Sequence, residues 1–431
     1  MLRDIFVKLK DWKNNPNKKP LIIKGARQVG KTWLMQEFGK QEYKDTVYIN
    51  FERDRSIHKI FDNDLNPTNI IENLEIKFDK NITNTTLIIF DEIQECPNAL
   101  TSLKYFCEES KYNIICAGSF LGIALHKNTS FPVGKVEFLT LYPLNFCEFL
   151  LANGKHKLVE LLKKQDFKQI QLFKNDFEKY LKLYFFIGGM PEVVQQYTEN
   201  NDLQLVKTIQ NRIIESYIND FSKYTEKNVF PRMLAIWQSI PSQLSKENKK
   251  FVYKDIKEGA RSKDYEIAMQ WLSDCGLIYK INKITKPNFP LSSYIDSSAF
   301  KLFLLDIGLL SCLSSLDQEI LINNNDIFVE FKGALTEQFI LQEMKCQDSL
   351  LINYWINGVN TAELDFIIQK NKYIIPIEVK ATTNLKAKSL KVYIDSNNPQ
   401  IAIRTSLADF KQSNCLFDVP LYCFANFIAS I

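Results

Sequence analysis

The chain has 431 residues, which is too long for one ordinary hydrophobic core, so we expect roughly two to four domains. Hydrophobic residues make up 45% of the sequence and charged residues 24%, as in soluble globular proteins. The net charge of +4 comes from 54 basic and 50 acidic residues, a balance too even to argue for nucleic-acid binding by itself.

The cysteines and histidines indicate neither a zinc site nor a disulfide framework. The nine cysteines are scattered without a C-x-x-C pair, and the three histidines lie far apart in the sequence. The start of the chain lacks a signal-peptide core, and no apolar run approaches the ~20 residues of a membrane span. We therefore expect a cytoplasmic protein with free thiols and no membrane partner.

The strongest motif spans residues 25–32, which read GARQVGKT and fit the phosphate-loop pattern G-x-x-x-x-G-K-[ST]. An apolar strand at residues 21–23 precedes the loop, and residues 32–38 begin a helix. Loop amides and a helix N-terminus present partial positive charge to phosphate oxygens. We expect ATP as the cofactor, with Lys31 reaching the β- and γ-phosphates and the Thr32 hydroxyl ligating Mg²⁺. The predicted cofactor-binding residues of the loop are Gly25, Ala26, Arg27, Gln28, Val29, Gly30, Lys31 and Thr32.

A second signal is the buried strand at residues 87–90, which ends in the carboxylates Asp91 and Glu92. Nucleotide hydrolases use the first such acid to hold Mg²⁺, here Asp91. Glu92 is then placed to polarise the attacking water as a general base. An apolar strand that ends in acidic residues is common in proteins. About 60 residues after a phosphate loop, the same pattern more specifically indicates a nucleotide-hydrolase site.

Two further polar residues are candidates in the same region. Ser119 follows an apolar strand at residues 113–118 and either senses the γ-phosphate or caps the next helix. Lys135, in a loop at residues 131–135, either carries a cation to the phosphates or is simply solvated.

These motifs resemble the prokaryotic AAA-type ATPases of the archaeal-ATPase kind, and Gly188-Gly189-Met190-Pro191-Glu192 is similar to another signature of that family. The resemblance implies an α/β fold with a P-loop parallel-sheet ATPase domain, a helical lid, a winged-helix middle and a C-terminal α/β domain like the restriction endonucleases. Relatives tend to carry arginine where this chain has Lys135, and lysine lacks the bidentate fork of an arginine finger.

The middle of the chain is predicted to be mostly helical. Residues 144–225 would form the lid over the nucleotide, where Arg212 either reaches the nucleotide or forms a surface salt bridge. Residues 226–318 follow a helix, helix, helix, hairpin order that is typical of a winged helix. Arg261 and Lys263 would contact DNA phosphates. Because Asp264 and Glu266 lie nearby, a winged helix used for protein packing is the alternative.

The C-terminal part resembles the PD-(D/E)xK nuclease core. Glu337 lies in a predicted helix, Asp365 in a strand that alternates with apolar residues, and Glu378 and Lys380 share one face of the next strand. Asp365, Glu378 and the carbonyl group of Val379 could hold Mg²⁺, and Glu337 would reach in from the helix. Lys380 could orient the attacking water, so the predicted catalytic residues are Glu337, Asp365, Glu378 and Lys380 here and Lys31 and Glu92 in the ATPase.

Two functions fit this pattern. In the first, an ATP-hydrolysing domain drives a nuclease-like domain that handles DNA, with Lys386, Lys388 and Lys391 lining a phosphate track. In the second, ATP switches a non-cleaving nuclease-like domain that binds a protein partner. The predicted domains are 1–143, 144–225, 226–318 and 319–431, and the sequence leaves the oligomeric state open.

Overall fold

The computed structural model describes residues 2–118, 131–317, 329–347, 350–358 and 361–431. The described chain divides into two compact units. Residues 2–142, with the short segment 274–276, form the first unit, and residues 143–273 and 277–431 form the second. The ranges expected as lid, winged helix and nuclease-like domain therefore all contribute to the second unit.

The first unit is built on a five-stranded parallel sheet with the strand order β2-β3-β4-β1-β5. The strands expected near residues 21–23, 87–90 and 113–118 are all present. Its strands are β1 (Leu21–Lys24), β2 (Asp45–Asn50), β3 (Thr86–Asp91), β4 (Asn113–Ala117) and β5 (Glu137–Thr140). Its helices are α1 (Ile5–Asn14), α2 (Lys31–Glu42), η1 (Arg55–Ile57), α3 (His58–Asn63), α4 (Pro67–Phe78), η2 (Ile93–Glu95) and α5 (Pro97–Glu109).

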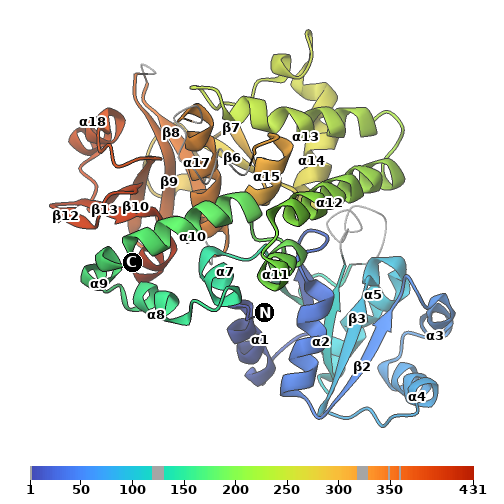
Figure 1. Ribbon diagram of the computed structural model, residues 1–431. Helices are drawn as coiled ribbons and strands as arrows, with labels where there is room; N and C mark the ends of the chain where they lie inside the picture. Colours follow the sequence, from blue (N-terminus) through green and yellow to red (C-terminus); the bar gives the residue numbers. More distant parts are fainter. Residues whose placement is uncertain (1, 119–130, 318–328, 348–349, 359–360) are drawn as a thin grey trace. The chain divides into compact units, whose positions relative to one another are not determined.

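Helices cover both faces of this sheet, which explains why its central strands are apolar throughout. Strands β3 and β4 are buried at every position. On one face α3, α4 and α5 pack over a core that contains Phe51, Phe61 and Phe90, and α2 lies on the other face (Figure 1). The three rings meet edge to face with centroids 5.5 to 5.7 Å apart. Because the strands are parallel, residues that follow β1 and β3 emerge at one edge of the sheet.

The second unit combines helices with an eight-stranded mixed sheet in the order β12-β13-β11-β10-β9-β8-β6-β7. Its helices before the sheet are α7 (Phe146–Ala152), α8 (His156–Lys164), α9 (Phe167–Leu172), α10 (Lys174–Ile187), α11 (Pro191–Asn200), α12 (Leu203–Tyr224), α13 (Phe230–Leu244), η3 (Tyr253–Asp255) and α14 (Ser262–Asp274). The sheet and its helices are β6 (Ile278–Ile284), η4 (Leu291–Tyr294), β7 (Ile295–Leu304), α15 (Ile307–Leu313), α17 (Val329–Lys345), β8 (Leu351–Ile356), β9 (Glu363–Lys370), β10 (Tyr373–Val379), α18 (Lys388–Asn397), β11 (Ala402–Ser406), β12 (Lys411–Ser413), β13 (Leu416–Pro420), η6 (Leu421–Cys423) and α19 (Phe424–Ser430).

The hairpin expected as the wing of a winged helix belongs to this sheet. Strand β6 pairs with β7 on one side and with β8 on the other, where Lys283 lies opposite Tyr354 and Ile284 opposite Trp355. An isolated two-stranded hairpin is marginally stable, and pairing with β8 satisfies the free edge of β6. The sheet is thus continuous across the expected boundary at residue 318.

Helix α17 is held by buried polar side chains that bond to neighbouring backbone groups. The Gln338 amide accepts a hydrogen bond from the Leu304 N–H (3.0 Å) and donates one to the Leu304 carbonyl (2.7 Å). Gln342 accepts from the Ile307 N–H (3.0 Å) and donates to the Tyr184 hydroxyl (2.8 Å). These paired groups offset the cost of burying polar atoms and fix the rotation of α17.

Residues 188–191 of the family-like signature form a tight corner between α10 and α11. Pro191 opens α11. The N–H of Gly189 donates to the buried carboxylate of Asp306 (2.7 Å), which also caps α15 through the Leu309 N–H (3.0 Å). The corner is therefore fastened to the segment that joins β7 to α15.

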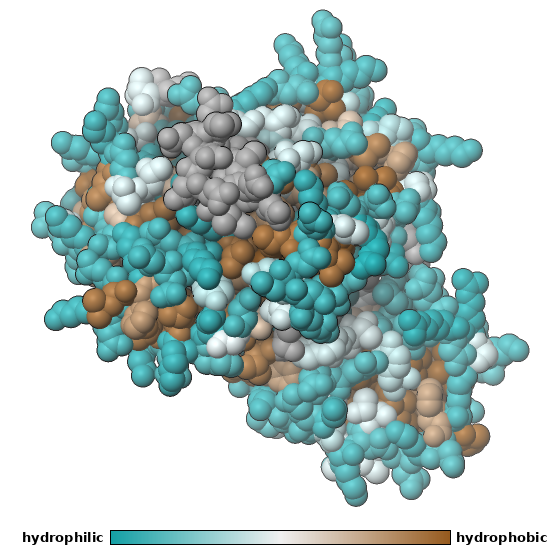
Figure 2. Space-filling view, viewed as in Figure 1, coloured by the Kyte–Doolittle hydropathy of each residue, from teal (hydrophilic) through white to brown (hydrophobic). Residues whose placement is uncertain are grey.

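The face of the molecule in Figure 2 is mainly hydrophilic, with apolar residues in separate patches. None of the helices in the described ranges has the length and apolar character needed to cross a membrane.

Candidate functional site

The loop of residues 25–30 connects β1 to α2 at the carboxyl edge of the first sheet. Gly25 has φ +146°, and a Cβ atom there would overlap the carbonyl oxygen of Leu141, so the loop requires glycine at this position. Arg3 donates from its guanidinium to the Val29 carbonyl (3.3 Å) and the Tyr142 carbonyl (2.6 Å). These contacts hold the loop in a shape that leads directly into the first turn of α2.

Lys31 is buried within the loop. Its ammonium group donates to the carbonyl oxygens of Gly25 (3.0 Å) and Ala26 (2.7 Å). Burial lowers the pKa of Lys31 to about 8, although the nearby carboxylates of Glu92 and Asp91 oppose this shift. The lysine is therefore a desolvated cation whose interaction with an anion would be strong.

Asp91 joins the loop to the end of β3. Its Oδ2 accepts hydrogen bonds from the Thr32 hydroxyl (2.7 Å) and the Tyr48 hydroxyl (2.8 Å). Burial raises the pKa of Asp91, and the bonds from Thr32 and Tyr48 work against that rise. Thr32 and Asp91 thus present two oxygen atoms side by side, which is the donor type that Mg²⁺ prefers.

Glu92 follows Asp91 at the edge of the sheet and adopts a left-handed backbone conformation with φ +51°. This conformation is uncommon for a non-glycine residue and is found at functional sites. The Gln94 amide donates to Glu92 Oε2 (2.7 Å) and fixes the orientation of the carboxylate. Glu92 is therefore a carboxylate held next to the Thr32–Asp91 pair.

The structure brings together most of the residues predicted for the nucleotide site and separates one of them. Residues 25–32 meet Asp91 and Glu92 at one edge, whereas Ser119 lies outside the described residues. Lys135 precedes β5, so it lies at the opposite, amino edge of the parallel sheet, where it pairs with Glu108 (3.2 Å). A role for Lys135 at the phosphates of the same chain is therefore wrong, because strand direction places it at the far edge.

Arg212 makes the surface salt bridge that was one of its two expected roles, since it pairs with Glu192 on an exposed part of the helical region. Tyr48 was not predicted. The only signal in the sequence is that Tyr48 alternates with the buried Val47 and Ile49, which places it on the other face of β2.

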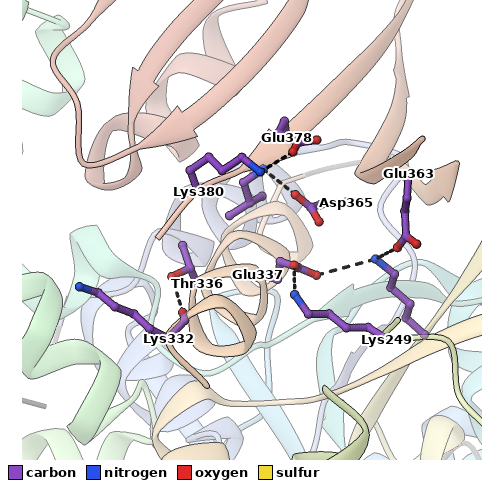
Figure 3. Close-up of polar contacts among 10 residues, drawn as sticks. Lys249, Lys332, Thr336, Glu337, Glu363, Asp365, Glu378 and Lys380 are labelled. Carbon is purple, nitrogen blue, oxygen red and sulfur yellow. Dashed lines mark hydrogen bonds and ion pairs between the residues drawn. The ribbon is translucent and has the colours of Figure 1, made fainter. Parts of the chain in front are cut away.

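The C-terminal candidates come from α17, β9 and β10 and point toward one another (Figure 3). Lys380 forms an ion pair with Glu378 (2.6 Å), and Glu378 is only 5% exposed. Asp365 accepts a hydrogen bond from the Val379 N–H (2.7 Å). The strand alternation predicted from the sequence thus puts these residues on one face, and Glu337 reaches them from the helix.

Two lysines that sequence reasoning missed enter the same cluster. Lys249 pairs with Glu337. Lys301 lies 2.7 Å from Glu363 and 3.8 Å from Glu337. A single lysine within the apolar run of β7 was a signal for Lys301, and nothing in the local sequence points to Lys249.

The charges in this cluster strongly perturb one another. Burial raises the pKa of Asp365 well above its ordinary value, and the Glu337 and Glu378 carboxylates raise it further. Burial also raises the pKa of Glu378, against the effect of Lys380. For Glu337, burial acts upward but Lys249 and Lys301 bring the pKa below its ordinary value. Such mutual perturbation in a buried cluster is typical of functional sites and also of structural ion networks.

The structure contains features for and against the predicted Mg²⁺ sites. In the described part of the chain, no group of three or more histidine, cysteine, aspartate or glutamate residues is arranged to hold a metal ion. However, Glu378 Oε2 and Glu337 Oε2 are buried without a hydrogen-bond partner. Buried carboxylate oxygens of this kind fit a hard cation, as do the hydroxyl of Thr32 and the carboxylate of Asp91 at the other site.

Three parts of the chain match protein families. Residues 17–150 match a family described as AAA domain, and residues 178–320 and 332–424 match two families described as domains of unknown function. The chain is 25% identical to the uncharacterized protein MJ1544 of Methanocaldococcus jannaschii over 91% of its own length and 80% of that protein.

Two solved structures are also similar. The Walker-type ATPase PABY2304 of Pyrococcus abyssi has 15% identity and a TM-score of 0.46, over 72% of this chain and 95% of that one. The Orc1 protein of Aeropyrum pernix, solved in complex with DNA, has 11% identity and a TM-score of 0.30, over 73% and 93%. The family match, the phosphate loop and the parallel sheet together make the N-terminal unit an AAA-type P-loop ATPase domain, a kind of domain that binds ATP.

Proposed function

We propose that the chain hydrolyses Mg²⁺-bound ATP at the edge formed by residues 25–32, Asp91 and Glu92, and that its C-terminal carboxylate cluster is a Mg²⁺-dependent site for DNA phosphodiesters. The observation that carries the ATPase proposal is the 2.7 Å hydrogen bond between Thr32 and Asp91, which joins the phosphate loop to the acidic end of β3.

Each residue of the ATPase site has a role in this proposal. The backbone amides of the loop and the N-terminus of α2 bind the phosphates. The Lys31 ammonium exchanges the carbonyl oxygens of Gly25 and Ala26 for phosphate oxygens. Thr32 and Asp91 would hold Mg²⁺, which would offset phosphate charge. Glu92 accepts the proton of the attacking water, in the orientation that Gln94 maintains.

At the C-terminal cluster, Asp365 and Glu378 would hold Mg²⁺, together with the Val379 carbonyl, and Glu337 lies close enough to support them. When bound, the ion would lower the pKa of a water molecule and offset charge on the phosphate. Lys380, fixed on Glu378, orients that water. Lys386, Lys388 and Lys391 are all exposed on or just before α18, which packs against β9 and β10, and could follow a DNA backbone.

A second function, a nucleotide-dependent switch with a non-cleaving C-terminal site, is favoured by one observation. Lysine side chains already pair with Glu337, Glu363 and Glu378. In an ion network of this kind the carboxylates have counter-charges without a metal ion or a substrate. In that case the exposed Arg261 and Lys263 and the C-terminal face would bind a protein rather than DNA.

The ATPase proposal is tested with Lys31→Ala. Removing a desolvated cation from the phosphates should weaken binding of a fluorescent ATP analogue about 100-fold or more. Lys40→Ala is the matched control, because Lys40 is exposed in the last turn of the same helix. Similar dissociation constants for Lys31→Ala and the wild type would exclude the loop as the nucleotide site.

The two functions are separated by DNA cleavage. Linear, supercoiled, single-stranded and branched DNA are incubated with Mg²⁺ or Mn²⁺, and ATP turnover is followed with and without each DNA. The nuclease proposal predicts cleavage that Asp365→Ala and Lys380→Ala each reduce at least about 100-fold. Intact DNA in every reaction would leave the switch as the function.

A further inference from the structure

The C-terminal cluster takes its acids and its lysines from different parts of the chain. Its carboxylates all come from the segment matched at residues 332–424, but two of its lysines come from the segment matched at residues 178–320. The acids are Glu337, Glu363, Asp365 and Glu378, the local lysine is Lys380, and the lysines from the preceding segment are Lys249 and Lys301.

The two lysines from the preceding segment, Lys249 and Lys301, differ in how deeply they are buried. Lys301 lies in β7 with 1% of its side chain exposed, pairs with Glu363, and sits 5.0 Å from the centre of the Tyr354 ring. Lys249 lies in the connection between α13 and η3, and 16% of its side chain is exposed. Lys301 is therefore part of the core, whereas Lys249 lies at the rim of the cluster.

The ammonium group of Lys249 lies next to α17. Its ammonium group is 3.9 Å from where a Cβ of Gly333 would stand, and it ends on Glu337, one turn further along the helix. Figure 3 shows that the side chain of Lys249 points toward Glu337. Lys332, which lies on α17 like Glu337, points away from the carboxylates. Lys249 is thus both in contact with the cluster and accessible from solvent.

The net charge of the C-terminal cluster indicates a role for Lys249. Metal binding requires ionised carboxylate ligands, so the count is made with all groups ionised. The four carboxylates and three ammonium groups that the described residues contribute then sum to −1. One divalent cation brings the sum to +1, which matches the single negative charge of a phosphodiester. Without Lys249 the cation-loaded cluster would be neutral and would attract no anion.

We propose that Lys249 is the residue that contacts the substrate phosphodiester in the C-terminal site, an inference that rests on the proposed function of that site. Its positive charge weakens binding of the metal ion and strengthens binding of the nucleic-acid backbone. A lysine from the middle segment thereby completes a site whose other components lie in the C-terminal segment.

The test uses the full chain with Lys249→Gln, which removes the charge but keeps a hydrogen-bond donor for Glu337. Lys249→Ala is a second neutral variant, Lys249→Arg keeps the charge, and Lys332→Ala is the control on α17. Mn²⁺ binding is measured by calorimetry, and binding of double-stranded DNA is measured in Ca²⁺. We expect the neutral variants to bind Mn²⁺ about tenfold more tightly and DNA about tenfold more weakly, with Lys249→Arg and Lys332→Ala close to the wild type.

Opposite changes in metal and DNA affinity would not follow from a merely structural lysine. Unchanged Mn²⁺ affinity, or unchanged DNA affinity, in a folded neutral variant overturns the proposal. Faster DNA cleavage by Lys249→Gln also overturns it, because Lys249 would then block the site. If the wild type cleaves no DNA, the proposed nuclease function fails, and the two binding measurements still decide the role of Lys249.

Discussion

At the residue scale, the proposed ATPase site requires that Asp91 stay ionised in a buried position. Burial raises the pKa of Asp91, and hydrogen bonds from Thr32 and Tyr48 oppose that rise. Each hydrogen bond that a hydroxyl group donates to an ionised carboxylate contributes about 1.5–3 kcal/mol. The two hydroxyl groups therefore protect the charge that would hold Mg²⁺.

Tyr48→Phe tests this arrangement through the pH dependence of ATP turnover. Without the Tyr48 hydroxyl, the pKa of Asp91 should rise further, so the carboxylate would protonate at a higher pH. The acidic limb of the turnover profile should shift toward neutral pH, with little change on the alkaline side. Tyr105→Phe, at a more exposed position on α5, should leave the profile unchanged. Superimposable profiles for Tyr48→Phe and the wild type would show that Tyr48 does not support Asp91.

Most residues of the two proposed sites carry a signal in the sequence because short-range rules apply to them. The phosphate loop is contiguous, and the alternation of a strand places Asp365 or Glu378 on a defined face. Tyr48, Lys249 and Lys301 were missed because their contacts depend on which distant strands pair. No periodicity in a single sequence shows that β6 pairs with β8.

At the element scale, the corner between α10 and α11 is fastened by close backbone approach. Gly188 has φ +75°, and a Cβ atom there would overlap the Asp306 carboxylate and the backbone of Gly308. The glycine pair of the motif is thus explained by packing.

Gly188→Ala should destabilise the second unit by several kcal/mol, since it combines an unfavourable φ with an overlap. Gly154→Ala is the matched control, because Gly154 has φ +72° but no atom within 4 Å of its Cβ position. It should cost only about 1–2 kcal/mol. Urea unfolding measures both variants, and equal losses would contradict the packing explanation.

Asp306 makes a pH-dependent contribution at the same corner. Burial raises its pKa to about 6 from 3.8, so the folded state favours the neutral acid. The unfolded chain releases this proton at lower pH. The contribution of Asp306 to stability should therefore fall by roughly 3 kcal/mol as the pH rises from 3 to 7. In urea unfolding, the deficit of Asp306→Asn relative to the wild type should therefore be larger at pH 4 than at pH 7. A deficit that does not change with pH would show that the acid is not held neutral.

At the scale of the whole molecule, the C-terminal sheet extends beyond the expected domain boundary. Strands β6 and β7 cover the edge of β8, and Lys301 from β7 neutralises buried acids of the cluster. Removing one partner of a buried ion pair costs roughly 3–5 kcal/mol. The region 319–431 therefore lacks both an edge strand and a counter-charge when it is separated from the rest.

A fragment of residues 319–431 should be insoluble or unfold without a cooperative transition, whereas residues 143–431 should unfold cooperatively. Thermal unfolding followed by circular dichroism compares the two fragments. A cooperative transition of the shorter fragment at the temperature of the longer one would contradict the continuity of the sheet.

The central proposal is an ATPase site in which Lys31 and Thr32 meet Asp91 and Glu92. The most direct measurement compares ATP binding and single-turnover hydrolysis in the wild type, Glu92→Gln and the control Glu37→Gln on α2, where Glu37 is half-buried. Glu92→Gln should bind Mg²⁺-ATP within a few-fold of the wild type and hydrolyse it at least about 100-fold more slowly, while Glu37→Gln behaves as the wild type. Equal hydrolysis rates in Glu92→Gln and the wild type would contradict the account.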